Sequence, residues 1–284
     1  MKKKNSIGIN IIIIAVYVLG VGILLYPVIS NVINSRNQTV VVSDYKSKVS
    51  QYKKSNQKEL EKIRQQAIAY NKELVNCGWT LYKDKGDFDH YNQQLLLPGT
   101  DVMAYITIPS INVQLPIYHG TDSSVLQKGV GHIEGTSLPI GGINTHSVLS
   151  GHRGLPSGGV LFSHLNLMEI GDIFSISVLG KRNFYQVYDI KTVLPNKINS
   201  LGIQRGKDLV TLVTCTPYSI NTHRLLVHAK RVFLNLNIIS NCRHIPFLRA
   251  AVGLWLVIVV MELVLYGIGR KIYLWIKKSD GKIK

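Results

Sequence analysis

Two long apolar runs, one near each end of the chain, constrain its fold more than any other feature. The first covers residues 7–29 and contains no charged residue over 23 positions, directly after three lysines. A helix of this length spans a hydrocarbon core of about 30 Å. A signal peptide also begins with lysines and an apolar run, but no small-residue cleavage site follows here. We therefore predict an uncleaved transmembrane helix at 7–29.

The second apolar run covers residues 249–269 and contains Glu262. A charge inside a membrane span costs about 2.5–3.5 kcal/mol on insertion scales, so a buried helix of a soluble domain is the alternative. The flanking Trp255, Tyr266, Tyr273 and Trp275 resemble interfacial anchors and favour a second transmembrane helix.

The position of the positive charge predicts the topology. The formal net charge is +17, and lysines and arginines gather in residues 1–6 and in the tail at 270–284. Under the positive-inside rule both termini are cytoplasmic, and the segment between the spans is extracellular. The sequence therefore predicts a two-span cell-membrane protein with lipid as a partner. The other basic residues form no stripe or nucleic-acid motif, so nucleic acid is not an expected partner.

The segment between the predicted spans changes character along its length. Residues 30–77 are predicted to be helical, because apolar residues recur on one helical face. Residues 78–99 are irregular and rich in Gly, Asp and Asn. Residues 100–235 contain many short β-branched runs separated by turns, with short helices near 124–128 and 161–167. This pattern indicates a mainly β fold, a closed or semi-closed barrel, followed by a linker at 236–248.

The three cysteines, Cys77, Cys215 and Cys242, do not have zinc-site spacing, and we expect no metal and no cofactor. Their odd number leaves at least one thiol without an intramolecular partner. The sequence allows a disulfide between Cys77 and Cys242 but does not require one. The count favours a protein with one reactive thiol over one held together by disulfides.

Cys215 has the surroundings of a nucleophile. An apolar run from Asp208 leads to it, Pro217 interrupts that strand, and a second strand starts near His223 and Arg224. A cation on the neighbouring strand would stabilise a thiolate or an oxyanion. The alternative is a buried structural cysteine.

Cysteine catalysis also needs a proton carrier, and His152 is the strongest candidate. It ends a strand in the segment VLSGHRG, between glycines that would let a substrate backbone approach. His119, His132 and His146 lie in glycine-rich loops and could be structural. His223 would point to the strand face opposite to Arg224.

The segment Thr211–Cys215 reads TLVTC and resembles the sortase signature TLxTC. The continuation 216–227 and the segments 117–142 and 145–165 are similar to class C sortases, the pilus-building subgroup. The similarity covers roughly residues 95–232, with several motifs in the same order. Two terminal membrane spans around an external domain also suit that subgroup. The resemblance implies a closed barrel of about eight strands and a cysteine transpeptidase.

The resemblance also implies roles for particular residues. Cys215 would cleave an LPxTG-like sorting signal between Thr and Gly and form a thioacyl-enzyme. His152 would move the protons, Arg224 would hold the substrate and the oxyanion, and Thr214 would help to shape the site. The implied acceptor is a lysine amine of another pilin subunit, so the product is an isopeptide-linked polymer.

Class C sortases carry a lid with an Asp-Pro-aromatic motif, and this sequence has no Asp-Pro pair. The nearest counterparts are Asp87 and Phe88, which we interpret as a degenerate lid, the alternative being an ordinary polar loop.

Two other functions remain open. A housekeeping-type sortase would use the same Cys215, His152 and Arg224 to attach surface proteins to cell-wall peptidoglycan. An inert membrane protein that scaffolds pilus assembly would not need all three residues.

Overall fold

The computed structural model describes residues 3–77, 90–153, 161–197, 199–218 and 220–233. The predicted lid residues Asp87 and Phe88, the linker, Cys242, the second apolar run and the basic tail lie outside these ranges. Within the described part of the chain, no helix has both the length and the apolar character needed to span a bilayer. The membrane spans at 7–29 and 249–269 stay predictions.

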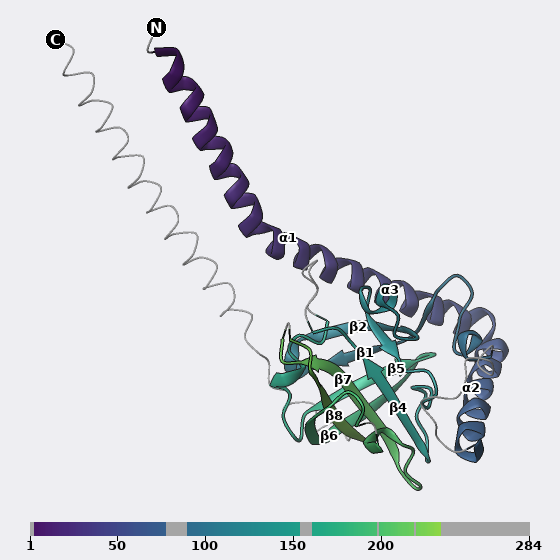
Figure 1. The fold of residues 1–284 in the computed structure, drawn as a ribbon. Coiled ribbons are helices and arrows are strands. Elements are labelled where there is room, and N and C mark those ends of the chain that lie inside the picture. The colour runs from purple at the N-terminus through teal and green to yellow at the C-terminus, as the bar shows by residue number, and fades with distance from the viewer. Residues whose placement is uncertain (1–2, 78–89, 154–160, 198, 219, 234–284) are drawn as a thin grey trace. The chain divides into compact units, whose positions relative to one another are not determined.

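Eight strands close into one barrel in the order β1-β2-β3-β4-β7-β8-β6-β5 (Figure 1), which confirms the predicted mainly β fold. Most neighbours are antiparallel, but β2 pairs with β3 and β4 with β7 in parallel. The strands are β1 Val102–Ile108, β2 Val113–His119, β3 Val130–His132, β4 Thr145–Ser150, β5 Ile173–Val178, β6 Lys181–Val193, β7 Asp208–Thr216 and β8 His223–Val232.

The helices lie mainly in the N-terminal part of the chain. Residues 30–77 are helical apart from Asn56, as predicted. Short helical segments also occur at both predicted places in the barrel sequence. The helices are α1 Lys3–Ser55, α2 Gln57–Cys77, α3 Ser123–Leu126 and the 3₁₀ turns η1 Tyr91–Gln93, η2 Pro109–Ile111, η3 Leu165–Leu167 and η4 Asn199–Leu201.

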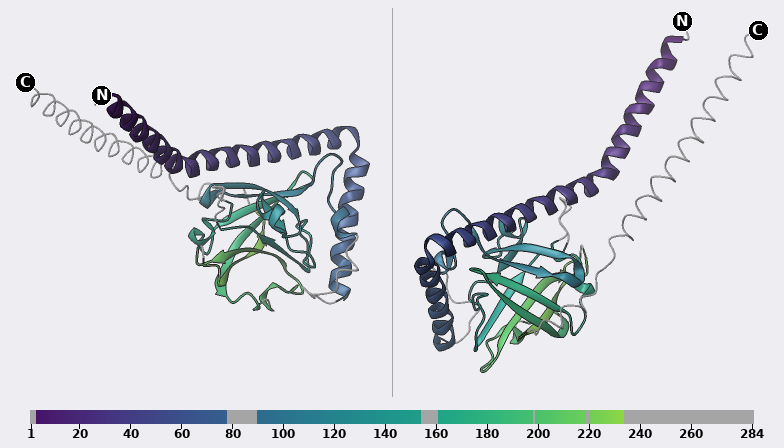
Figure 2. Two further views of the ribbon diagram at one scale, coloured as in Figure 1. Left: turned by 45° about the horizontal axis from the view of Figure 1, so that its top comes forward. Right: turned by 180° about the vertical axis from the view of Figure 1, so that it is seen from behind.

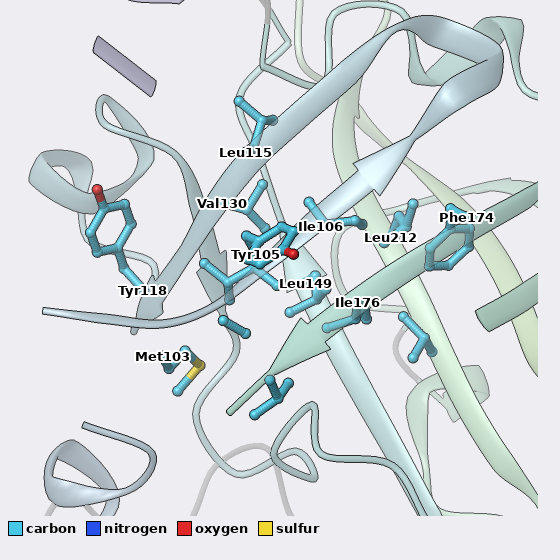
Figure 3. Close-up of a cluster of buried hydrophobic side chains, with 14 of the residues drawn as sticks. Met103, Tyr105, Ile106, Leu115, Tyr118, Val130, Leu149, Phe174, Ile176 and Leu212 are labelled. Atoms are coloured by element: carbon cyan, nitrogen blue, oxygen red, sulfur yellow. The ribbon is translucent and has the colours of Figure 1, made fainter. Parts of the chain in front are cut away.

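Apolar side chains from all around the barrel fill its interior (Figure 3). Met103, Ile106, Leu149, Ile176 and Leu212 have no exposed surface. They come from two pairs of neighbouring strands, β1 with β5 and β4 with β7, on different sides of the closed barrel (Figure 2). Burial of this apolar surface, at roughly 25 cal/mol per Å², is the main force that holds the strands together.

The two long helices are attached to the barrel by buried polar contacts. The Tyr45 hydroxyl of α1 donates to the Met103 carbonyl at 3.0 Å and accepts from the Leu179 amide at 3.1 Å. The Asn71 side chain of α2 donates to the Leu138 carbonyl at 3.2 Å and accepts from its amide at 2.7 Å. Because both partners of each bond are buried, these contacts fix where the helices meet the barrel.

The two faces of β7 have different surroundings. Val210 and Leu212 belong to the interior cluster, whereas Val213 belongs to a second, smaller apolar cluster with Val148, Leu201 and Leu226. Successive side chains of a strand point to opposite sides, so Thr211, Val213 and Cys215 share the outer face. The outer face of β4, β7 and β8 therefore carries the predicted nucleophile.

Candidate active site

Cys215 lies next to the last residue of β7, and Arg224 is directly opposite it on β8. Residues opposite each other in an antiparallel pair project to the same side, with Cβ atoms about 4.5–5.5 Å apart. The Cys215 thiol is half-buried and not in a disulfide. The structure thus brings the predicted nucleophile and the predicted cation together. His223 pairs with Thr216 and projects to the other side, in agreement with the sequence analysis.

The Arg224 guanidinium is oriented by its own loop. Its Nη1 donates to the carbonyl oxygens of Asn221 at 3.0 Å and His223 at 3.1 Å. A guanidinium has five N–H donors in a planar fork, so three N–H groups remain for a substrate carbonyl or an oxyanion. Asn221 adopts a left-handed conformation with φ of 60°, which turns the chain from β7 back into β8.

His152 reaches the same end of the barrel through the parallel pairing of β4 with β7. Ser150 is in register with Val213, and the Gly151 amide donates to the Val213 carbonyl at 3.0 Å. The Thr214 hydroxyl, which is buried, donates to the Gly151 carbonyl at 2.8 Å. The residue before Cys215 therefore holds the residue before His152. Thr214, which the signature predicted as a site residue, therefore positions the loop that carries His152.

Gly151 is required by packing. A Cβ atom added there would lie 2.7 Å from Cδ2 of the buried Phe162 ring. The Phe162 amide donates to the His152 carbonyl at 3.1 Å, so the same residue supports the backbone of His152. The sequence analysis assigned this glycine to close substrate approach. The structure gives a further reason for glycine here, because the Phe162 ring excludes a side chain.

Burial lowers the pKa of His152 below its usual value of 6.5. A lowered pKa favours the neutral imidazole at pH 7, which is the form that can accept a proton. His132 and His146 are also neutral, because burial lowers the pKa of each to about 4. Both are hydrogen-bonded within the fold, His132 to the Ser137 carbonyl at 2.8 Å and His146 to the Gly202 carbonyl at 2.9 Å. Their contacts are structural.

Arg153 is a site residue that the sequence analysis did not single out. Its Nη1 donates to the Thr216 hydroxyl at 2.7 Å, so it connects the loop of His152 to the residue after Cys215. The only sequence signal for this contact is its position beside His152.

Thr211, the first residue of the signature, also has a structural contact on the outer face. Its hydroxyl lies 2.7 Å from Nε2 of His146 and 2.7 Å from Nδ1 of His228. Because His146 Nδ1 donates to Gly202, its Nε2 must accept the Thr211 proton, and Thr211 in turn accepts from His228. The three residues form a buried chain that holds β4, β7 and β8 together below Cys215.

A half-buried thiol opposite a guanidinium, with an imidazole just after the end of the adjoining parallel strand, is an arrangement that suits cysteine-dependent acyl transfer. The fold that carries it is a closed barrel of eight strands.

Comparison with known proteins places this arrangement in a family. The sortase domain model matches residues 106–232. Sortase C1 from Streptococcus agalactiae is 47% identical and has a TM-score of 0.64, covering 68% of this chain and 98% of that one. Sortase C from Clostridium perfringens, solved with the C-terminal cell wall sorting motif, is 43% identical with a TM-score of 0.59, covering 69% and 100%. The chain therefore belongs to the sortase family of cysteine transpeptidases, and class C sortases are among its structural neighbours.

Sortase D of Bacillus subtilis is 32% identical over 130 residues, which are 45% of this chain and 62% of that protein. The match thus spans less than two thirds of that relative.

Proposed function

We propose that this protein is a pilus-building sortase that cleaves an LPxTG-like sorting signal between Thr and Gly and joins the acyl group to a lysine amine of a second pilin. The observation that carries the proposal is the register of Cys215 with Arg224 at the end of two paired strands. The 42–47% identity to four sortase C proteins over nearly their whole solved chains supports the pilin substrate class.

In the first half of the reaction neutral His152 takes the proton of the Cys215 thiol, and the resulting thiolate attacks the carbonyl carbon of the threonine in the sorting signal. Charge develops on the carbonyl oxygen, and the Arg224 guanidinium stabilises it. The C–N bond to glycine then breaks, His152 in its protonated form supplies the proton to the departing amine, and a thioester to Cys215 remains. The Gly151 and Thr214 contacts hold the backbone before His152 against the backbone before Cys215 during this step.

In the second half the lysine ε-amine attacks the thioester carbonyl. His152, now neutral, takes the proton from the amine, the C–S bond breaks, and an isopeptide bond forms while the thiolate is regenerated. The lowered pKa of His152 suits this step, because the imidazole has to be neutral to accept the proton.

Exposed apolar residues beside the thiol support a peptide substrate. Tyr218 and Ile220, in the loop between β7 and β8, are 58% and 67% exposed. Val213 and Leu226, two residues from Cys215 and Arg224 on the same outer face, belong to an apolar cluster. An extended peptide carrying Leu and Pro would bury apolar surface along this side of the strands.

We also propose that the enzyme is anchored in the cell membrane by residues 7–29 and 249–269, with both termini cytoplasmic and the barrel outside. The support is the sequence: two apolar runs with basic clusters on their terminal sides. Cysteine accessibility to a membrane-impermeant reagent in cells checks this topology. Labelling of a cysteine introduced in the tail at 270–284, in intact cells, would contradict it.

The function is tested with the full chain in nanodiscs, incubated with a pilin that carries a sorting signal. We expect covalent ladders resistant to SDS, and Cys215→Ala should lower their rate of formation by at least about 1,000-fold. Ladders formed by Cys215→Ala would favour the scaffold function. Product linked to a wall peptide, with no pilin ladder, would favour the housekeeping function.

A further inference from the structure

A cavity of about 690 Å³ lies at the other end of β7 from Cys215. Its lining includes Lys181, Lys207, Asp208, Lys230, Arg231 and Phe233, and we call it the distal cavity. Asp208 begins β7 and Cys215 lies seven residues further, which is about 23 Å at the rise of a β-strand. The distal cavity is therefore separate from the site of acyl transfer.

The lining of the distal cavity is strongly basic. Five of its residues are Lys or Arg and only one, Asp208, is acidic. Lys181, Lys207 and Lys230 are exposed, so their ammonium groups are accessible to a ligand. A concave surface with one sign of charge concentrates ions of the opposite sign.

Asp208 offsets only one of these five positive charges, and its oxygens are hydrogen-bonded inside the fold. They accept hydrogen bonds from the Gly142 amide at 2.8 Å, the Tyr185 hydroxyl at 3.2 Å and the Thr145 hydroxyl at 3.4 Å. The nearest Arg231 nitrogen, Nη1, is 3.8 Å away, beyond hydrogen-bond length.

Arg231 is held ready for an anion. Its guanidinium packs over the rings of Tyr185 and Phe233, at 5.5 Å and 5.6 Å from their centroids. Within the described residues its Nε atom is buried and has no hydrogen-bond partner. The Arg231 side chain as a whole is 21% exposed, and the planar fork of a guanidinium matches the oxygen atoms of a phosphate group.

A lipid headgroup and a wall polymer both carry phosphate groups. Three exposed lysines and Arg231 around one cavity match several phosphates of one chain better than the single phosphate of a headgroup, which favours a polymer.

We propose that the distal cavity binds the phosphodiester groups of a linear, anionic wall polymer, with the lysines contacting successive phosphates and Arg231 contacting one of them. The proposal rests on the extracellular placement under the proposed function. Binding there would hold the enzyme in the wall while the Cys215 end stays open to pilins.

The test uses the full chain in phosphatidylcholine nanodiscs, titrated with soluble poly(glycerol phosphate) in a calorimeter. We expect saturable binding that weakens at least tenfold in the double variant Lys181→Glu/Lys230→Glu. The matched control is Lys53→Glu/Lys54→Glu, which makes the same change in net charge at two exposed residues of α1 outside the cavity. The control should bind like the wild type.

Three results would overturn the proposal. They are equal binding by the wild type and the Lys181/Lys230 variant, equal weakening in the control variant, and equal affinity for poly-glutamate of the same charge. Nanodiscs that contain phosphatidylglycerol test whether a lipid headgroup fills the cavity instead. If the wild type no longer binds the polymer in these nanodiscs, the site belongs to lipid and the wall-polymer assignment is overturned. Cleavage of a sorting-signal peptide in the same samples should be unchanged by both variants. Binding without cleavage by the wild type would refute the proposed function and leave the site standing.

Discussion

The inner and outer faces of β7 are made by alternate residues of one strand, and their side chains have different neighbours and different functions. Val210 and Leu212 on the inner face are fully buried among apolar side chains. On the outer face, Thr211 contacts a histidine chain, Val213 belongs to a small apolar cluster, and Cys215 lies opposite Arg224. The inner face therefore carries the main apolar core, whereas the outer face carries the reactive thiol together with the histidine chain that joins β4, β7 and β8.

The largest effect is expected on the inner face. Leu212→Ala should lower the free energy of unfolding by about 2–5 kcal/mol, because it leaves a cavity in a fully buried core. Denaturant unfolding of the full chain in detergent measures this change. The transpeptidation rate per folded molecule should stay within about twofold of the wild type. Leu194→Ala, at a residue that is 48% exposed, is the control and should change stability little. A large loss of rate in folded Leu212→Ala would break the separation of the faces.

On the outer face, Arg224→Lys should lower kcat/KM for a sorting-signal peptide by about 100- to 1,000-fold. The substitution keeps the charge opposite Cys215 but removes the planar fork of donors that an oxyanion requires. Thermal unfolding should be nearly unchanged, because Arg224 is not part of the core. Full activity in Arg224→Lys would show that only charge matters at this position.

The histidine chain beneath Cys215 predicts how stability depends on pH. Burial lowers the pKa of His146 to about 4, whereas the unfolded chain has a value near 6.5. As pH falls below 6.5 the unfolded state binds the proton first, so stability present above 6.5 is lost progressively down to about pH 4. The loss from this residue is at most about 3 kcal/mol. Unfolding curves of His146→Asn should depend less on pH in that window; curves parallel to those of the wild type would contradict the assignment.

The smallest effect is expected at Thr214, the residue of the signature that precedes Cys215. Thr214→Val removes the hydroxyl that bonds the Gly151 carbonyl, and we expect kcat to fall about tenfold because His152 is then less firmly placed. KM should change little, since Thr214 is buried. Thr214→Ser keeps the hydroxyl and should recover most of the rate; failure of Ser to do so would mean that the bond does not position His152.

Much of the fold could be predicted from local patterns. The β-branched runs after residue 100 predicted a barrel, and the apolar spacing from Val49 to Leu74 predicted helix, both of which the structure shows. The strand order could not be predicted, because the pairing of β4 with β7 joins residues more than sixty positions apart. Periodicity reports which face of a strand is apolar, not which strand will lie beside it.

The sequence by itself determined the candidate thiol, its neighbouring cation and the signature around them, because those residues are close along the chain or at the ends of adjacent strands. Only the tertiary structure decided that Thr214 holds the His152 loop, that Phe162 requires Gly151, and that Arg153 contacts Thr216. It also placed Arg231 and the lysines around one cavity at the far end of β7. These contacts depend on closure of the barrel, which brings distant segments within hydrogen-bond length, and no local pattern records that distance.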